Sequence, residues 1–270
     1  MRGYKVGDLI DGEFFVHDIF GRESKSGMGV VYLVTSREVD TPFVLKTFQN
    51  LEDSSKLRQS FLKEAEAWVK LGRHPNVVQA FWVREISNQP FVAAEFISGD
   101  DDGRNTIGNF CQKGAVPITS AIKWGCQFCF GMLHALKNNI IAHRDIKPAN
   151  LMVDSSMNLR ITDFGLVKSV NIEEVSIRDG NIASAANINA TARGTAMGTY
   201  PYMAPEQFTD AKSVDHRADI YSFGIVLFQM LSGGQLPFVP NPNSKNIALD
   251  FYNLHVSAKW NAPQQLDKTC

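Results

Sequence analysis

Short runs of Val, Phe, Tyr and Thr, separated by turn-forming residues, occupy most of the first hundred positions of the chain. Such runs predict strands, because β-branched and aromatic side chains fit the pleated surface of a sheet. We expect strands at residues 14–20, 29–35, 43–48, 77–85 and 91–97. Between the third and the fourth, residues 54–71 place apolar side chains three and four positions apart, which predicts a helix with one buried face.

The pattern becomes helical after a polar stretch at residues 98–105, which reads SGDDDGRN and is typical of a linker. Residues 118–138 predict a long helix, and residues 218–231 are apolar on nearly all sides, as in a buried helix. Residues 170–193 are rich in Ser, Asn and Ala without a clear period, so we expect a mobile loop there. The pattern predicts an α+β chain in three parts: a sheet-rich lobe at 1–97, a linker at 98–105 and a larger helical lobe at 106–270.

The composition indicates a folded protein and excludes several kinds of partner. With 270 residues, 44% of them hydrophobic, the chain can bury the core of one large domain or of two packed lobes. Its formal net charge of -1 gives no indication of a nucleic-acid or membrane-surface partner. No apolar run approaches the roughly 20 residues of a membrane span. The N-terminus lacks the pattern of a secretory signal, so we expect a cytoplasmic protein.

Two of the four cysteines, Cys126 and Cys129, form a CQFC run that can indicate redox chemistry. The run lies inside the helix predicted at 118–138, and no strand precedes it. We therefore expect these two residues to be thiols of the core rather than a redox pair.

Residues 143–150 read HRDIKPAN and place three complementary side chains in one loop. Phosphoryl transfer needs a carboxylate near the attacking hydroxyl, a cation near the migrating phosphate and oxygen ligands for Mg²⁺. Asp145 can accept the hydroxyl proton, Lys147 can hold the γ-phosphate, and Asn150 can offer its amide oxygen to a metal ion. Asp163, in TDFGLVK, can face a metal ion as well. The two motifs together indicate phosphoryl transfer.

With these motifs in this order, the chain resembles the Hanks-type protein kinases, in particular the eukaryotic-like Ser/Thr kinases of bacteria. The resemblance runs from about residue 15 to residue 238 and implies a two-lobe fold, with a small antiparallel-sheet lobe and a larger helical lobe. It also implies ATP and Mg²⁺ as cofactors. Lys46, in FVLKTF, matches the lysine that holds the α- and β-phosphates, and Glu64 matches the glutamate that pairs with this lysine. Glu66 is an alternative to Glu64.

The same resemblance locates a nucleotide pocket, in which the backbone of residues 95–97 binds the adenine edge and apolar side chains sandwich the ring. Ala94 occupies the gatekeeper position before this hinge, where so small a side chain leaves a cavity behind the adenine. The residues assigned to the pocket in this way are Gly27, Gly29, Val31, Val44, Lys46, Glu95, Ile97 and Met152.

Residues 198–207, GTYPYMAPEQ, resemble the substrate-docking segment of protein kinases, which kinases of small molecules generally lack. The resemblance therefore implies a protein as the acceptor, and Lys147 favours Ser/Thr over Tyr. Thr199 should then lie near Asp145 and Lys147. Asp219 should brace the catalytic loop through backbone amides, because a buried carboxylate needs such donors.

The glycine loop departs from the family pattern. The run FGRESKSGMGVVY keeps Gly27 and Gly29, but serines replace the earlier glycines unless Gly21 takes the first position. The resemblance therefore implies no phosphate contacts before Ser26, and an ordinary hairpin turn is the alternative.

Two further departures concern regulation and stability. The segment from Asp163 to Glu206 is long and contains Ser176, Ser184, Thr191 and Thr195, which suits regulation by phosphorylation through a pair with Arg144. No arginine follows residue 238, so we expect Glu206 to lack its usual partner.

Two other functions remain as alternatives to an active Ser/Thr kinase. The irregular glycine loop would suit a nucleotide-binding pseudokinase or scaffold, and a small-molecule phosphotransferase would share the catalytic loop. A full-length protein could carry additional domains or form a homodimer.

Overall fold

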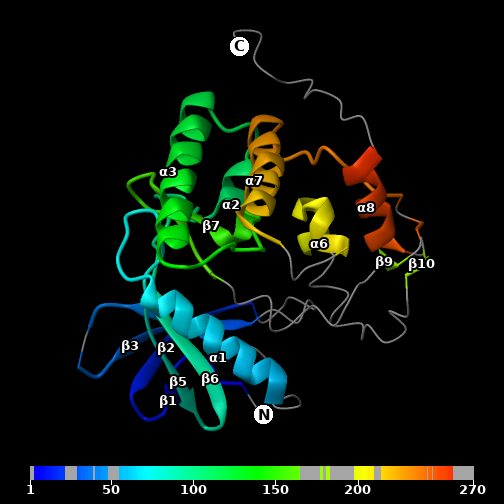
Figure 1. Cartoon of the computed structure of the whole chain (residues 1–270). Coiled ribbons are helices and arrows are strands. Elements are labelled where there is room, and N and C mark those ends of the chain that lie inside the picture. Colours follow the sequence, from blue (N-terminus) through cyan, green and yellow to red (C-terminus); the bar gives the residue numbers. More distant parts are fainter. Residues whose placement is uncertain are drawn as a thin grey trace.

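A six-stranded antiparallel sheet forms the N-terminal part of the fold, and mainly helices follow it (Figure 1). The computed structural model describes residues 3–21, 29–38, 40–47, 55–164, 177–178, 181–182, 198–209, 214–241, 243–244 and 246–257. The strands of the sheet are β1 (Leu9–Ile10), β2 (Phe14–Phe20), β3 (Val30–Ser36), β4 (Phe43–Thr47), β5 (Ala80–Ile86) and β6 (Gln89–Glu95). They lie in the order β1-β2-β3-β4-β6-β5. All five predicted strands are thus confirmed, and β1 is an additional one.

The fourth predicted strand begins later than expected. β5 starts at Ala80, whereas Val77 forms a parallel bridge with Ile161. The Val78 amide donates to the Ile161 carbonyl at 2.9 Å, and the Ile161 amide donates to the Asn76 carbonyl at 3.0 Å. The residues before β5 therefore leave the sheet because their backbone pairs with a strand of the helical part.

The two faces of the sheet pack against different partners. On one face, Tyr32 and Leu45 belong to a buried cluster formed within the sheet region. On the other face, Val92 and Ala94 belong to the main core cluster, together with residues of α1 (Ser55–Lys70). The buried residues of α1 in this cluster include Phe61, Ala65 and Trp68. Their spacing of three and four positions is the pattern that predicted this helix.

The helical part is built around α3 (Ile118–Lys137) and α7 (His216–Leu231), which confirm the two long helices predicted there. Phe128 and Phe223 join the two helices, with stacked rings whose centroids are 4.0 Å apart. The other helical elements are α2 (Ile107–Cys111), η2 (Pro148–Asn150), η3 (Tyr200–Tyr202), α6 (Pro205–Thr209) and α8 (Ile247–Ser257). Among the described residues, no helix is both long and apolar enough to cross a membrane.

Two hairpins complete the described structure. β7 (Leu151–Val153) pairs with β8 (Leu159–Ile161), and β9 (Ile177–Arg178) pairs with β10 (Asn181–Ile182). The second hairpin lies within residues 170–193, where we expected a loop, and the rest of that range lies outside the described residues.

The expectation that Cys126 and Cys129 are core thiols is wrong, because both are exposed. The buried positions of α3 are Ala121, Trp124, Phe128, Gly131 and Ala135. They recur three and four positions apart and define one face of the helix. The two cysteines fall on the opposite face.

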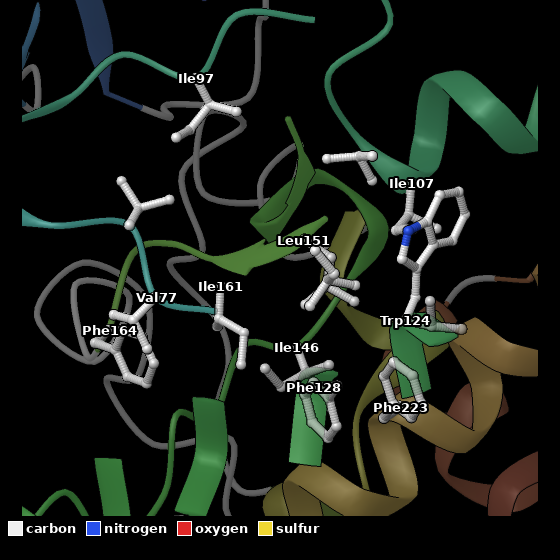
Figure 2. Close-up of a cluster of buried hydrophobic side chains, with 14 of the residues drawn as sticks. Val77, Ile97, Ile107, Trp124, Phe128, Ile146, Leu151, Ile161, Phe164 and Phe223 are labelled. Carbon is white, nitrogen blue, oxygen red and sulfur yellow. The ribbon is translucent and has the colours of Figure 1, made fainter. Parts of the chain in front are cut away.

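One continuous hydrophobic cluster joins the sheet region to the helices. Figure 2 shows its middle, where Val77 lies near Ile161 and Phe164, and where Trp124 and Phe128 of α3 approach Phe223 of α7. The cluster extends from Phe61 in α1 to Met230 in α7. The loops that carry the candidate site therefore rest on a shared core.

Candidate active site

The loop after α3 brings Asp145, Lys147 and Asn150 together, and all three are buried. Lys147 Nζ lies 2.8 Å from Asp145 Oδ2. The amide nitrogen of Asn150 donates to the same oxygen and to the Asp145 carbonyl, each at 2.8 Å. Thr199 donates to Asp145 Oδ1 at 3.2 Å and accepts from Lys147 Nζ at 3.3 Å. The predicted approach of Thr199 to this pair is confirmed.

Asp219 of α7 braces the start of this loop, as predicted. Its buried carboxylate accepts the backbone amides of His143 and Arg144, each at 2.8 Å. Burial raises the pKa of the Asp219 carboxyl, and His143 and Arg144 oppose that rise. Arg144 is held at a φ of 70°, a left-handed conformation that is uncommon for a non-glycine residue. Asp219 therefore fixes a strained turn just before Asp145.

Lys46 of β4 and Asp163, which follows β8, form an ion pair between the sheet and the helical part. Phe164 is buried next to His143, with ring centroids 4.8 Å apart. The His143 side chain also donates from Nε2 to the Thr162 carbonyl at 2.8 Å. The segment around Asp163 is therefore attached to the catalytic loop through His143.

Val31, Val44 and Ala94 share one face of the sheet with Lys46. Val31 is the register partner of Lys46, and Val44 is the register partner of Ala94. Antiparallel partners point to the same side of a sheet, as do residues two positions apart in one strand. Met152 of β7 and Val44 both pack, half-buried, against the main core cluster. This arrangement suits a pocket for an adenine ring, although the binding roles of these residues remain predictions.

Helix α1 carries both candidate glutamates. Glu66 is exposed and lies 4.0 Å from Lys70, one turn later on the surface. Glu64 is half-buried. These positions favour Glu64 over Glu66 as the glutamate that faces the core, while its pairing with Lys46 remains a prediction.

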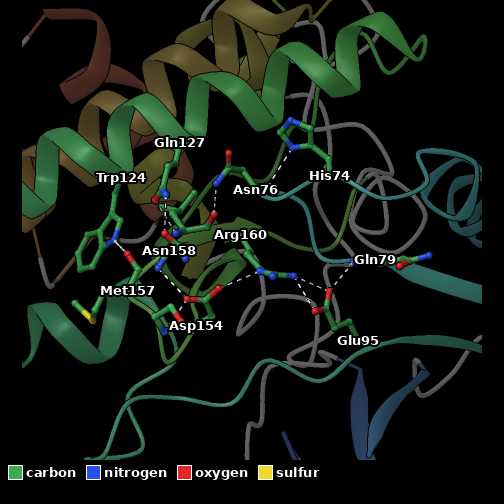
Figure 3. Close-up of polar contacts among 12 residues, drawn as sticks. His74, Asn76, Gln79, Glu95, Trp124, Gln127, Asp154, Met157, Asn158 and Arg160 are labelled. Carbon is green, nitrogen blue, oxygen red and sulfur yellow. Dashed lines mark hydrogen bonds and ion pairs between the residues drawn. The ribbon is translucent and has the colours of Figure 1, made fainter. Parts of the chain in front are cut away.

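A charged network attaches the predicted hinge to β8 (Figure 3). Arg160 Nη1 donates to both carboxylate oxygens of Glu95, at 2.7 and 2.8 Å, and Arg160 Nε donates to Asp154 Oδ2 at 3.3 Å. The Glu95 amide also donates to the Gln79 carbonyl at 2.9 Å. Arg160 was not identified from the sequence. The sequence signal that could have indicated it is a charged residue in a strand between two apolar residues, Leu159 and Ile161, which are buried in the structure.

The donor set at the end of this loop fits a magnesium ion. Asn150 uses its amide nitrogen on Asp145, so its amide oxygen points the other way. The Thr162 amide donates to the Asn150 carbonyl at 3.0 Å, which places Asn150 close to the neighbouring Asp163. Mg²⁺ prefers one or two carboxylate or amide oxygens and completes its coordination with phosphate and water. Asn150 and Asp163 supply that kind of set.

The glycine loop is described only at its ends. Gly27 and the serines before it lie outside the described residues. Gly29 is buried, and Gly21 has a φ of 85°. A Cβ at Gly21 would lie 2.9 Å from the Gly29 carbonyl oxygen, so this close approach requires glycine. The Ser and Thr residues expected to regulate the chain, at positions 176, 184, 191 and 195, also lie outside the described residues.

A cavity of about 600 Å³ opens beside Lys147, and Gly198 and Tyr202 line it on the side of the predicted docking segment. Gln207 attaches this segment to the catalytic loop. Its side chain accepts the Ala204 amide and donates to the Arg144 carbonyl, each at 3.0 Å. The cavity and the docking segment therefore lie next to the loop that carries Asp145 and Lys147.

Glu206 was expected to lack an arginine partner, because none follows residue 238 in the chain. The structure places Arg217, which precedes residue 238, close enough to Glu206 for the two charges to interact. Asp215 raises the pKa of the Arg217 guanidinium most, and Glu206 also contributes to the rise. Arg217 itself pairs with Asp215, 3.0 Å away, so Glu206 contributes only a longer-range interaction, and the lack of its usual partner stays a prediction.

Known proteins resemble this chain along most of its length. Residues 25–270 match the family described as protein kinase domain. A probable serine/threonine-protein kinase of Clostridium perfringens (strain 13 / Type A) is 30% identical over 210 residues, which is 77% of this chain. The serine/threonine-protein kinase pkn2 of Myxococcus xanthus is 30% identical over 264 residues, which is 96% of this chain. The chain spans only 27% and 28% of the lengths of these two relatives.

A solved structure agrees in fold. The kinase domain of PknI from Mycobacterium tuberculosis superimposes with a TM-score of 0.63 at 20% identity, covering 95% of this chain and 92% of that one. The predicted two-lobe fold, with a small antiparallel-sheet lobe and a larger helical lobe, is confirmed.

Proposed function

Because the chain belongs to the protein kinase domain family, we propose that it transfers the γ-phosphoryl group of ATP to Ser or Thr residues of proteins. The observation that carries this proposal is the environment of the Thr199 hydroxyl. It donates to Asp145 while it accepts from Lys147. An alcohol therefore fits between the carboxylate and the ammonium group that the transfer requires.

In the proposed reaction, an acceptor hydroxyl approaches Asp145 from the cavity beside Gly198. Its oxygen forms a bond to the γ-phosphorus while the bond from this phosphorus to the β–γ bridging oxygen breaks. The acceptor proton passes to Asp145, and ADP leaves. Lys147, which already lies 2.8 Å from Asp145, neutralises charge on the migrating phosphoryl group.

The nucleotide is proposed to lie between the sheet and the catalytic loop. Lys46 would hold the α- and β-phosphates, and Glu64 would orient Lys46. The backbone of Glu95 and Ile97 would bind the adenine edge, with the ring enclosed by apolar side chains. Those enclosing side chains are Val31, Val44 and Met152, and the loop at Gly27 and Gly29 would cover the phosphates.

Asn150 and Asp163 would hold Mg²⁺. When bound, the ion would neutralise negative charge on the phosphates. Lys46 contributes a second positive charge beside Asp163. The proposed site would thus bring Mg²⁺ and the Lys46 ammonium group to the phosphates.

The test is phosphate transfer from labelled ATP with Mg²⁺ to a generic basic protein, followed by analysis of the labelled amino acids. We expect label on Ser or Thr with the wild type and none with Asp145→Asn. Asp40→Asn, an exposed substitution between β3 and β4, is the matched control and should transfer like the wild type. Thermal stabilisation by Mg-ATP without transfer would refute the proposal and favour a nucleotide-binding pseudokinase. Label on a small alcohol instead of protein would favour a small-molecule phosphotransferase.

A further inference from the structure

His255 of α8 uses both nitrogens of its ring in hydrogen bonds to two other elements. Its Nε2 lies 3.1 Å from the carbonyl oxygen of Tyr200, and its Nδ1 lies 2.7 Å from the hydroxyl of Tyr221. A carbonyl only accepts, so Nε2 carries the proton and Nδ1 accepts from the Tyr221 hydroxyl in the neutral ring. His255 therefore connects α8, η3 and α7.

The ring is enclosed by aromatic side chains. Its centroid lies 4.9 Å from that of Phe238 and 6.1 Å from those of Phe208 and Phe251. His255 is 9% exposed, so water competes little for its two hydrogen bonds. A polar residue with both nitrogens satisfied in such a cluster fixes the geometry of its partners more strictly than an apolar residue would.

The backbone group that His255 holds is adjacent to the catalytic residues. Tyr200 directly follows Thr199, whose hydroxyl contacts both Asp145 and Lys147. Tyr200 also belongs to a small cluster with Phe208 of α6 and residues of α8. In Figure 1, α6 and α8 lie side by side.

We propose that His255 is a positioning residue for the acceptor: by holding the Tyr200 carbonyl, it keeps Thr199 against Asp145 and Lys147. This inference rests on the proposed kinase function. It assigns His255 to the acceptor side, where Gly198 and Tyr202 line the cavity beside Lys147. Nucleotide binding should be independent of it, because Lys46 and the hinge lie on the sheet side.

Three variants test this role. His255→Leu removes both hydrogen bonds, and we expect the acceptor kcat/KM to fall about fivefold or more, the factor that one lost hydrogen bond represents. His255→Gln keeps an N–H that can reach the Tyr200 carbonyl, so it should recover most of the loss. Tyr221→Phe removes only the hydroxyl and leaves the ring packed, so it serves if His255→Leu does not fold. His17→Leu, on β2, is the matched control.

Two measurements accompany the kinetics. The dissociation constant of ATP should stay within twofold of the wild type in every variant. Hydrogen exchange at the amides of residues 198–200, 202 and 203 should be faster in His255→Leu and in Tyr221→Phe, and near the wild-type rate in His255→Gln.

The outcomes separate the two proposals. An unchanged acceptor kcat/KM, an equal loss of ATP affinity, or a failure of His255→Gln to recover activity would overturn the positioning role. A wild-type chain that transfers no phosphate would refute the kinase proposal. In that case, faster exchange in the variants would show that the hydrogen bond from His255 to Tyr200 only stabilises the fold, and the positioning role would be refuted as well.

Discussion

Asp219→Asn is the substitution for which the structure gives the sharpest expectation of stability. The Asp219 carboxylate accepts two backbone amides, those of His143 and Arg144, and its side chain is buried. Asparagine has nearly the same shape but only one accepting oxygen. Its amide nitrogen would therefore face one of the two backbone N–H groups, donor against donor.

The size of the effect follows from those two bonds. Hydrogen bonds to a charged group contribute about 1.5–3 kcal/mol each, and a buried donor left without a partner costs about 1–3 kcal/mol. One bond remains in the variant, so we expect a loss of about 2–4 kcal/mol in the free energy of unfolding. For a chain of this size that corresponds to a fall of roughly 5–15 °C in the unfolding temperature. Transfer should also slow, because Arg144 precedes Asp145.

The assay is chemical unfolding in urea, with thermal unfolding as a second measurement. Asp215→Asn is the matched control on the same helix. Asp215 caps the start of α7 by accepting the Arg217 amide at 2.9 Å, and asparagine caps a helix as well as aspartate does. The control also loses the exposed ion pair with Arg217, which contributes little because water and salt screen it, so it should unfold close to the wild type. A loss in Asp219→Asn no larger than that in the control would refute the reasoning, since it would mean that the two buried bonds contribute little.

Three further predictions concern the hinge, pH and the gatekeeper position. Arg160→Met, which removes the ion pair with Glu95, should weaken ATP binding by up to about fivefold in calorimetry, whereas Arg217→Met should leave it unchanged. Burial lowers the pKa of His255 below 6.5, so on acidification the unfolded chain binds a proton at a higher pH than the folded chain does. The contribution of the neutral His255 to the free energy of unfolding is therefore complete above pH 6.5 and is lost as the pH falls towards the pKa of the folded state. The free energy of unfolding should accordingly fall between pH 7.5 and pH 5.5, and equal falls in wild type and His255→Gln would contradict this. Ala94→Phe should raise the inhibition constants of ATP-competitive inhibitors with bulky aromatic groups, and unchanged constants would show that the gatekeeper assignment is wrong.

Much of the site could be predicted from the sequence because its reactive groups lie in short contiguous motifs. Asp145, Lys147 and Asn150 fall within one loop, so their proximity follows from chain connectivity alone. The role of Asp219, a carboxylate in an otherwise apolar helix, could be assigned because the resemblance implied that backbone amides of the catalytic loop bind it. Only the first case follows from local sequence. Asp219 lies 76 positions from His143, so its contact could be assigned only through the resemblance.

The residues that were missed make contacts that only the folded chain defines. Arg160 and Glu95 are 65 positions apart, and His255 and Tyr200 are 55 positions apart. Neither pair belongs to a motif, and the helix that carries His255 was itself not predicted. An isolated Arg in a strand or His in a short apolar segment has many possible partners, and spacing does not choose among them.

Helix α3 shows the same limit in packing. Its sequence is so apolar that hydrophobicity alone could not tell which face is buried, and Ile122 and Phe130 prove to be 60% and 58% exposed. Gly131 marks the buried face better than any apolar residue does. A Cβ at that position would lie 2.7 Å from the Asn76 carbonyl oxygen, so the close approach of the residues before β5 depends on glycine. Cys126 and Cys129 are rotated away from Gly131, and that rotation, more than their apolar neighbours, determines that both thiols face solvent.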